Sequence, residues 1–203
     1  MTERDLWTTL YHLKDIHRTG WLDRGIPAAE AESVADHCFF VMLIAWTAAQ
    51  SDTSLDANKV LQLAMIHDTA EAIAGDLPPY DPEDIPTDPD AMRTFFSVRL
   101  QRSPENAARK RALEETAAAH LLTLVRDTAT THWQNLWHEY EAQISAEARF
   151  VKEVDRLEVF IQSRIYAGRF PNAPVDGFSD MARQTITHPL LVPIRDAFLE
   201  EMG

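Results

Sequence analysis

The sequence predicts an all-α protein of a single domain, and two observations carry that prediction. Apolar residues recur at helix spacing along the chain, and no segment shows the alternation of apolar and polar residues that is typical of strands. Short interruptions rich in Gly, Pro or Ser separate the periodic segments. We therefore expect a bundle of roughly six to nine helices. The interruptions are expected at residues 20–29, 51–54, 75–89 and 168–178.

The helices of the N-terminal half follow from apolar stripes and caps. The first is indicated by Leu6, Leu10 and Leu13. Ser33 is a suitable N-cap for the next helix, whose apolar residues continue to Ala45. Residues 55–74 are apolar on most sides, which predicts one buried helix. The segment 75–89 contains five prolines and is therefore predicted to be non-helical.

The C-terminal half continues the helical pattern. A stripe of large apolar residues between Phe150 and Ile161 predicts a long helix that faces the core on one side. The expected helices are residues 91–100, 105–126, 133–143, 145–166, 181–187 and 192–202. We expect one domain over residues 1–203, with the chemical motifs in residues 6–166 and a helical extension in residues 167–203.

Composition limits the classes of partner. A formal net charge of −13 repels nucleic-acid backbones, so we expect no nucleic-acid partner. No apolar run is long enough for a membrane span, and the charged N-terminal segment lacks the apolar core of a signal peptide. Cys38 is the one cysteine and has no partner for an internal disulfide. These features favour a cytoplasmic protein without a membrane anchor.

The first candidate for chemistry is His67-Asp68, which ends an almost wholly apolar helical run. An unpaired carboxylate in such surroundings would cost several kcal/mol, so Asp68 needs a cation or hydrogen-bond donors nearby. A buried hydrogen bond between the two side chains, or a pair of helix caps, would also explain this dipeptide.

Two further residues favour a metal ion. His37 lies in the first turns of the preceding apolar helix, and Asp155 lies inside the predicted helix 145–166. Together with His67 and Asp68 they form a mixed nitrogen and oxygen set. Such a set suits one divalent ion, Mn, Fe, Co, Ni or Zn, and leaves coordination positions for water and a phosphate oxygen.

Two acids follow the His-Asp pair. Glu71 comes four residues after His67 and projects from the same helical face. Asp76 follows directly after Gly75. Either acid could accept protons or hold water without binding the metal. A solvated helix acid and a turn residue are the simpler interpretations of Glu71 and Asp76.

At this point the sequence resembles the HD-domain 5′-deoxynucleotidases, in particular their eukaryotic branch. Each matching motif is loose, but together, in this order, they are specific. The motifs are residues 18–21 (RTGW), 32–37 (ESVADH), 67–76 (HDTAEAIAGD), 136–141 (LWHEYE) and 145–152 (SAEARFVK), followed by Asp155. The resemblance implies an all-helical HD-domain fold, a homodimer, and one divalent ion. The implied metal ligands are His37, His67, Asp68 and Asp155.

The resemblance also implies roles for four neighbouring residues. Glu71 would orient the attacking water, and Asp76 would act near the sugar 3′-hydroxyl or in proton transfer. Arg18 would bind the phosphate of the substrate. Trp21 would contact the nucleoside, although in the bacterial branch the tryptophan directly follows the arginine, whereas here Thr19 and Gly20 intervene. A core aromatic is the alternative for Trp21, and preference for deoxyribose over ribose stays open.

The predicted function is metal-dependent removal of the 5′-phosphate from (deoxy)nucleoside monophosphates. Two alternatives stay open. The first is an HD hydrolase of another nucleotide, such as a nucleoside triphosphohydrolase or a biosynthetic nucleotide dephosphorylase. The second is a non-catalytic protein that senses nucleotides. The remaining histidines show no pairing at ligand spacing, so we expect no second metal ion.

Overall fold

The computed structural model describes residues 3–200 and confirms the all-α prediction. Within this range no strand is present, and a single isolated bridge joins His17 and Ser33. The helices are α1 (Glu3–Tyr11), α2 (Thr19–Leu22), α3 (Val34–Ala49), α4 (Ala57–Ile66), α5 (Glu71–Ala74), α6 (Pro89–Phe96), α7 (Pro104–Leu122), α8 (Asp127–Ala142), α9 (Ala146–Arg169), α10 (Gly177–Thr185) and α11 (Val192–Glu200). Two 3-10 helices, η1 (His12–Lys14) and η2 (Pro82–Asp84), complete the described chain.

Side-chain caps define where several helices begin. Ser33 caps α3 as predicted: its hydroxyl accepts from the backbone N–H of Asp36, and the Asp36 carboxylate accepts from the backbone N–H of Ser33. This reciprocal arrangement satisfies two amide groups that the first turn would otherwise leave unpaired. Ser145 caps α9 with one hydrogen bond of this kind: its hydroxyl accepts from the backbone N–H of Ala148. The two helices that carry His37 and Asp155 therefore begin at fixed residues.

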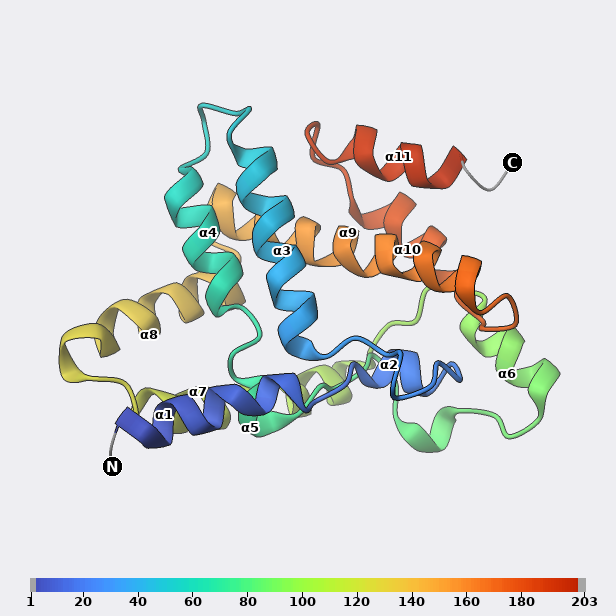
Figure 1. Ribbon diagram of the computed structural model, residues 1–203, viewed down its shortest axis with the longest axis horizontal. Helices are drawn as coiled ribbons and strands as arrows, with labels where there is room; N and C mark the ends of the chain where they lie inside the picture. The colour runs from blue at the N-terminus through green and yellow to red at the C-terminus, as the bar shows by residue number, and fades with distance from the viewer. Residues whose placement is uncertain (1–2, 201–203) are drawn as a thin grey trace.

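Helix α9 is the centre of the bundle. It is 24 residues long, and α3, α4, α8, α10 and α11 all pack against it. In Figure 1, α9 passes behind the upright pair α3 and α4, while α1 and α5 lie below them. Its apolar stripe, which includes Phe150, Val154, Leu157 and Phe160, is fully buried in the main core. The largest core therefore lies on the helix that also carries Asp155.

The C-terminal segment belongs to this same core. Ala182 of α10, Ile186 directly after this helix and Leu191 are fully buried in the main cluster. Helix α10 begins at Gly177 and ends at Thr185, so it starts four residues before the expected helix 181–187. Helix α11 begins at Val192 as expected, and the last two residues of the expected helix 192–202 lie outside the described range. In the described part of the chain no helix combines the length and apolarity that a membrane crossing requires.

The structure also corrects other expected boundaries, among them the ends of the expected helices 91–100 and 105–126, which are at Phe96 and Leu122. The predicted single helix at 55–74 is two helices, because the chain turns at residues 67–70 between α4 and α5. The predicted loop at 20–29 contains most of α2. Helix α8 begins at Asp127, six residues before its predicted start. The Pro-rich segment contains η2, and Pro89 is the first residue of α6, a position where its missing N–H costs no hydrogen bond.

Candidate metal centre and active-site pocket

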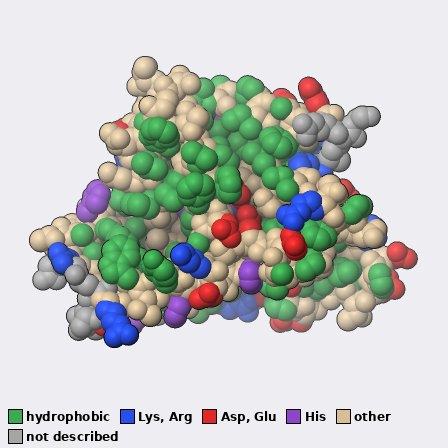
Figure 2. Space-filling view, viewed as in Figure 1, with side chains coloured by type: hydrophobic (Ala, Val, Ile, Leu, Met, Phe, Trp, Pro, Cys, Tyr) green, Lys and Arg blue, Asp and Glu red, His purple; other side chains and the backbone are tan. Residues whose placement is uncertain are grey.

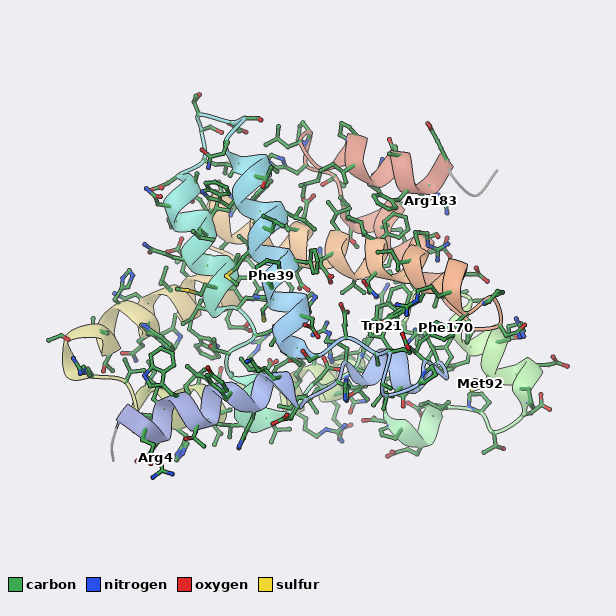
Figure 3. All side chains as sticks on the ribbon, viewed as in Figure 1. Arg4, Trp21, Phe39, Met92, Phe170 and Arg183 are labelled. Atoms are coloured by element: carbon green, nitrogen blue, oxygen red, sulfur yellow. The ribbon has the colours of Figure 1, made fainter. Side chains whose placement is uncertain are left out.

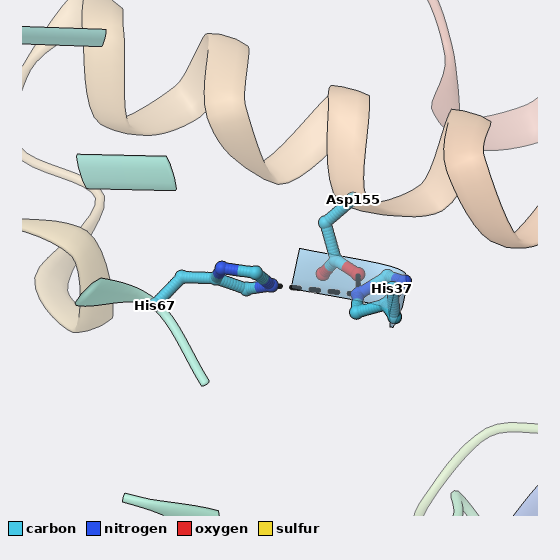
Figure 4. A group of neighbouring side chains, drawn as sticks. All are labelled: His37, His67 and Asp155. Atoms are coloured by element: carbon cyan, nitrogen blue, oxygen red, sulfur yellow. Dashed lines mark hydrogen bonds and ion pairs between the residues drawn. The ribbon is translucent and has the colours of Figure 1, made fainter. Parts of the chain in front are cut away.

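The four predicted metal ligands meet in the interior. His37 Nε2 lies 3.3 Å from Asp155 Oδ1, 3.5 Å from Asp68 Oδ2 and 3.4 Å from His67 Nε2. His67 Nε2 is 3.2 Å from the same Asp68 oxygen. Figure 4 shows His37, His67 and Asp155 pointing toward one another from α3, the end of α4 and α9. Residues separated by up to 118 positions (155 − 37) therefore share one small volume.

The turn after α4 directs His67 and Asp68 into this volume. His67 is the C-cap of α4, and α5 begins only at Glu71. The Thr69 hydroxyl donates to the Ile66 carbonyl at 2.8 Å, which fixes the turn from within. Because the helix stops here, two adjacent side chains approach one point, whereas in a continuous helix they would diverge by about 100°.

The protonation of the two imidazoles follows from their outer contacts. His67 Nδ1 lies 2.7 Å from the Ala64 carbonyl oxygen, which can only accept, so this nitrogen carries the proton. His37 Nδ1 lies 2.5 Å from Glu158 Oε2 and donates to that carboxylate. In the neutral rings both Nε2 atoms then present lone pairs to each other and to two carboxylates. This donor set fits a divalent cation, because a cation would be attracted by all four atoms at once.

The pKa values of the groups in this cluster also indicate that it favours a positive charge. Burial lowers the pKa of His37, but the carboxylates of Glu158 and Asp155 raise it to about 10 overall. Burial acts to raise the pKa of Asp68, yet His67 and Arg18 together bring it below its usual range. In the metal-free protein a proton on His37 therefore supplies part of the positive charge that the acids favour.

Arg18 closes one side of the cluster. Its Nη1 lies 3.0 Å from Asp76 Oδ1, 3.2 Å from Asp68 Oδ2 and 3.6 Å from Glu71 Oε2. Burial opposes its charge, but Asp76 and Glu71 raise the pKa of Arg18 well above its ordinary value. The structure thus brings Arg18 together with a predicted ligand and with both predicted catalytic acids.

Asp76 is held in place by the backbone around Arg18. The Thr19 N–H donates to Asp76 Oδ2 at 2.7 Å, and the Thr19 hydroxyl donates to the Asp76 carbonyl at 2.9 Å. Gly75 precedes it with φ of 77°, a backbone conformation that favours glycine and ends α5. Asp76 is therefore more than a turn residue, because its side chain connects the loop before α2 to the end of α5.

Glu71 is buried rather than solvated. Its side chain is 4% exposed, and its Oε2 has no hydrogen-bond partner among the described residues. Burial and the nearby Asp68 raise the pKa of Glu71 well above its ordinary value. A buried carboxylate oxygen without a partner is costly, which indicates a site where a water molecule or a ligand completes the hydrogen bonding.

A cavity of about 310 Å³ opens beside this cluster. Its wall includes Arg18, Asp68, Glu71, Asp76 and Asp155. The rest of the wall is formed largely by apolar and basic side chains, among them Trp21, Tyr80, Phe178, Met181, Arg102 and Lys152. Phe178 and Met181 come from the segment after residue 167, to which the sequence assigned no chemistry.

Trp21 lies in the pocket wall and in the core at once. It is 2% exposed and packs against Tyr166 and Phe178, and Figure 3 shows it near Phe170 beneath the end of α9. Its indole N–H donates to Glu32 Oε1 at 2.7 Å. The indole nitrogen is therefore occupied, and a ligand in the cavity would contact the ring itself.

Two residues of the site had no predicted role. Lys152 donates to Asp155 Oδ2 at 2.9 Å and to the Tyr140 hydroxyl at 3.1 Å. Glu158 contacts His37 from the other side. Lys152, Asp155 and Glu158 are spaced three residues apart on α9, so they share one helical face. This spacing was the signal in the sequence from which both roles could have been suspected.

Known proteins resemble this chain in sequence and in fold. Residues 10–189 match the HD domain family. The chain is 31% identical to a 5′-deoxynucleotidase HDDC2 from Xenopus laevis, over 93% of this chain and 82% of that protein. It is 30% identical to 5′-deoxynucleotidase HDDC2 from Homo sapiens, over 90% of this chain and 77% of that protein.

Solved structures share the fold. An HD-domain phosphohydrolase from Listeria innocua superposes with a TM-score of 0.68 at 18% identity, covering 98% of this chain and 90% of that one. A predicted metal-dependent phosphohydrolase from Magnetospirillum magnetotacticum gives 0.66 at 23% identity, covering 98% and 92%. The chain has the helical bundle of these proteins, and it brings His37 together with His67-Asp68 and Asp155. Because the family model also matches residues 10–189, the chain belongs to the HD-domain family.

Proposed function

We propose that this chain is a 5′-deoxynucleotidase, a metal-dependent phosphohydrolase that removes the 5′-phosphate of (deoxy)nucleoside monophosphates. The observation that carries the proposal is the convergence of His37, His67, Asp68 and Asp155 beside Arg18 at one end of a cavity. The relatives named as 5′-deoxynucleotidases, which match most of the chain, support the substrate class.

In this proposal the four converging side chains hold one divalent ion. When bound, such an ion polarises a phosphoryl oxygen and lowers the pKa of water. Glu71, with its buried Oε2, holds and orients the attacking water. Arg18 donates to the phosphate and offsets the charge that develops during phosphoryl transfer.

The remaining pocket residues bind the nucleoside. Asp76, fixed by Arg18 and the Thr19 N–H, lies where it can accept a hydrogen bond from a sugar hydroxyl or take up a proton. The ring of Trp21 forms part of the wall against which the nucleoside packs. Lys152 holds the outer oxygen of Asp155 and adds a second positive charge to the cavity.

Phosphate release tests the proposal. Purified protein is assayed with deoxy- and ribonucleoside mono- and triphosphates, with Co, Mn, Fe, Ni and Zn in turn. Orthophosphate from monophosphates supports the proposal, whereas pyrophosphate or tripolyphosphate from triphosphates would favour the alternative triphosphohydrolase. Turnover of no nucleotide by metal-loaded protein would favour a nucleotide-sensing role.

Ligand variants test the metal centre. Asp68→Ala and Asp155→Asn should both lose bound metal and activity, because each removes or neutralises a carboxylate that contacts His37 Nε2. Glu115→Gln, an exposed residue on α7, is the matched control and should change neither. Full metal content and full activity in both aspartate variants would contradict the assignment.

We also infer a cytoplasmic homodimer. The supporting surface is the apolar face of α3, defined by Phe39, Leu43 and Trp46, which are 56%, 46% and 45% exposed. Their spacing of four and three places them on one side of the helix. Figure 2 shows hydrophobic side chains gathered over this part of the molecule. A second copy that covers this face would remove the large aromatic side chains from water.

A further inference from the structure

The face of His37 that is turned away from the four ligands contacts a buried acid. His37 Nδ1 lies 2.5 Å from Glu158 Oε2, and the side chains are 0% and 4% exposed. The two groups are in direct contact in the interior, and Glu158 belongs to the same helix as Asp155. The imidazole is thus held between two carboxylates, Asp155 at Nε2 and Glu158 at Nδ1.

We propose that Glu158 is a positioning residue that fixes the tautomer and the ring plane of His37 for metal binding. By accepting the proton of Nδ1, its carboxylate leaves Nε2 as the nitrogen that faces the ion, so that the metal takes the place of the Nε2 proton, and it makes the ring a stronger ligand. This inference rests on the proposed metal centre, to which it adds a residue that contacts neither metal nor substrate.

The geometry of α9 supports this role. Asp155 and Glu158 are three residues apart on one face of a helix that is buried along its apolar stripe. The distance between the metal-facing carboxylate and the acid behind His37 is therefore set by the helix itself. His37 of α3 fits into the space that these two side chains leave, so the packing of α3 on α9 aligns the ligand.

A second buried acid lies nearby but is engaged elsewhere. Oxygen and nitrogen atoms of Glu32, His37 and Glu158 lie within 4.8 Å of one another. Glu32 Oε1, however, accepts from the indole N–H of Trp21 at 2.7 Å, whereas Glu158 forms the hydrogen bond to the imidazole. Glu32 is therefore a buried acid like Glu158 but lacks its hydrogen bond to His37, which makes it a discriminating comparison.

The test measures metal affinity directly. Metal-free protein is titrated with Co²⁺ in competition with a chromogenic chelator, and the visible absorption of bound Co²⁺ is recorded. Glu158→Ala should weaken affinity by about 10- to 100-fold, and Glu158→Gln, whose amide oxygen can still accept from Nδ1, should weaken it less. Glu158→Ala should also alter the Co²⁺ spectrum, since the ring is no longer held in one plane, and Glu158→Gln should alter it less.

Three comparisons make the result decisive. Glu32→Gln should leave Co²⁺ affinity within a few-fold of the wild type, and the thermal unfolding of each metal-free variant shows that it is folded. Equal losses in Glu32→Gln and Glu158→Gln would mean that buried charge alone matters, and would overturn the positioning role. If His37→Ala loses Co²⁺ while Glu158→Ala binds it normally, Glu158 is excluded and the metal centre stands. If His37→Ala also binds normally, both proposals fail.

Discussion

Arg18 allows the sharpest test of how charge is distributed in the site. Its guanidinium lies within 3.6 Å of Asp68, Glu71 and Asp76, three carboxylates that are at most 15% exposed. Removal of one partner of a buried ion pair costs ~3–5 kcal/mol, because the other charge stays buried without compensation. We therefore expect Arg18→Ala to lower the free energy of unfolding of the metal-free protein by about this amount.

The same substitution should affect metal binding and catalysis in opposite ways. Without the arginine the acids attract a cation more strongly, so the affinity for Mn²⁺ or Co²⁺ should stay the same or rise. Catalysis should fall, since loss of one group that stabilises developing charge typically lowers kcat by about 10²- to 10³-fold. The added metal should also restore part of the lost stability.

Chemical unfolding with and without Mn²⁺, a metal titration and steady-state kinetics together measure these effects. Arg93→Ala, an exposed arginine on α6, is the control and should behave as the wild type. Arg18→Lys keeps one positive charge but lacks the planar fork, so it should recover stability better than activity. If Arg18→Ala loses metal as Asp68→Ala does, or keeps the wild-type kcat/KM, the reasoning is refuted.

Four further outcomes are expected. Glu71→Gln should lower kcat by about 10²-fold or more with unchanged metal content, measured by steady-state kinetics and elemental analysis; an unchanged kcat would exclude Glu71 from holding and activating the attacking water. Gly177→Ala should lower Tm, because its Cβ would lie 2.7 Å from the Phe96 carbonyl oxygen, and overpacking costs ~1–3 kcal/mol; an unaltered melting curve would contradict this. Trp46→Glu should yield a monomer by light scattering if α3 forms the dimer interface, and a persisting dimer would exclude this face. Chelation of the metal should abolish nucleotide binding in calorimetry, and tight binding to chelated protein would argue against a metal-held phosphate.

The sequence predicted most helices because their cause is local. The stripe of apolar residues on α9 and the Ser33 cap of α3 are visible in the order of residues, and both lie where the pattern indicated. The turn between α4 and α5 was missed for an equally physical reason. Residues 60–66 and 70–74 are mostly apolar or good helix formers, and the His67-Asp68-Thr69 segment between them contains neither Gly nor Pro, so no strong local signal marks Ile66 as the last residue of α4.

In the site, too, residues within sequence motifs were predicted, whereas a residue whose role depends on a contact between distant segments was not. Its four ligand candidates and Arg18 were predicted from motifs, and the structure places them together. The three-residue spacing from Asp155 does not by itself single out Glu158, because an acid on a long helix most often faces water. Its importance depends on α3 packing His37 against it, which is a contact across 121 positions of the chain (158 − 37).

Electrostatics explains why a protein with a net charge of −13 would need a metal to bind an anion. Three of the basic side chains that line the cavity are paired with acids: Arg18 contacts three carboxylates, Lys152 contacts Asp155, and Lys110 pairs with Glu114. Arg18 and Lys152 lie beside the metal-binding acids and are offset by them, so this end of the cavity has little free positive charge for a phosphate. A divalent ion shifts this local balance by two positive charges. Metal and nucleotide binding should therefore be coupled, and by linkage the nucleotide must raise the affinity for the metal by the same factor as the metal raises the affinity for the nucleotide.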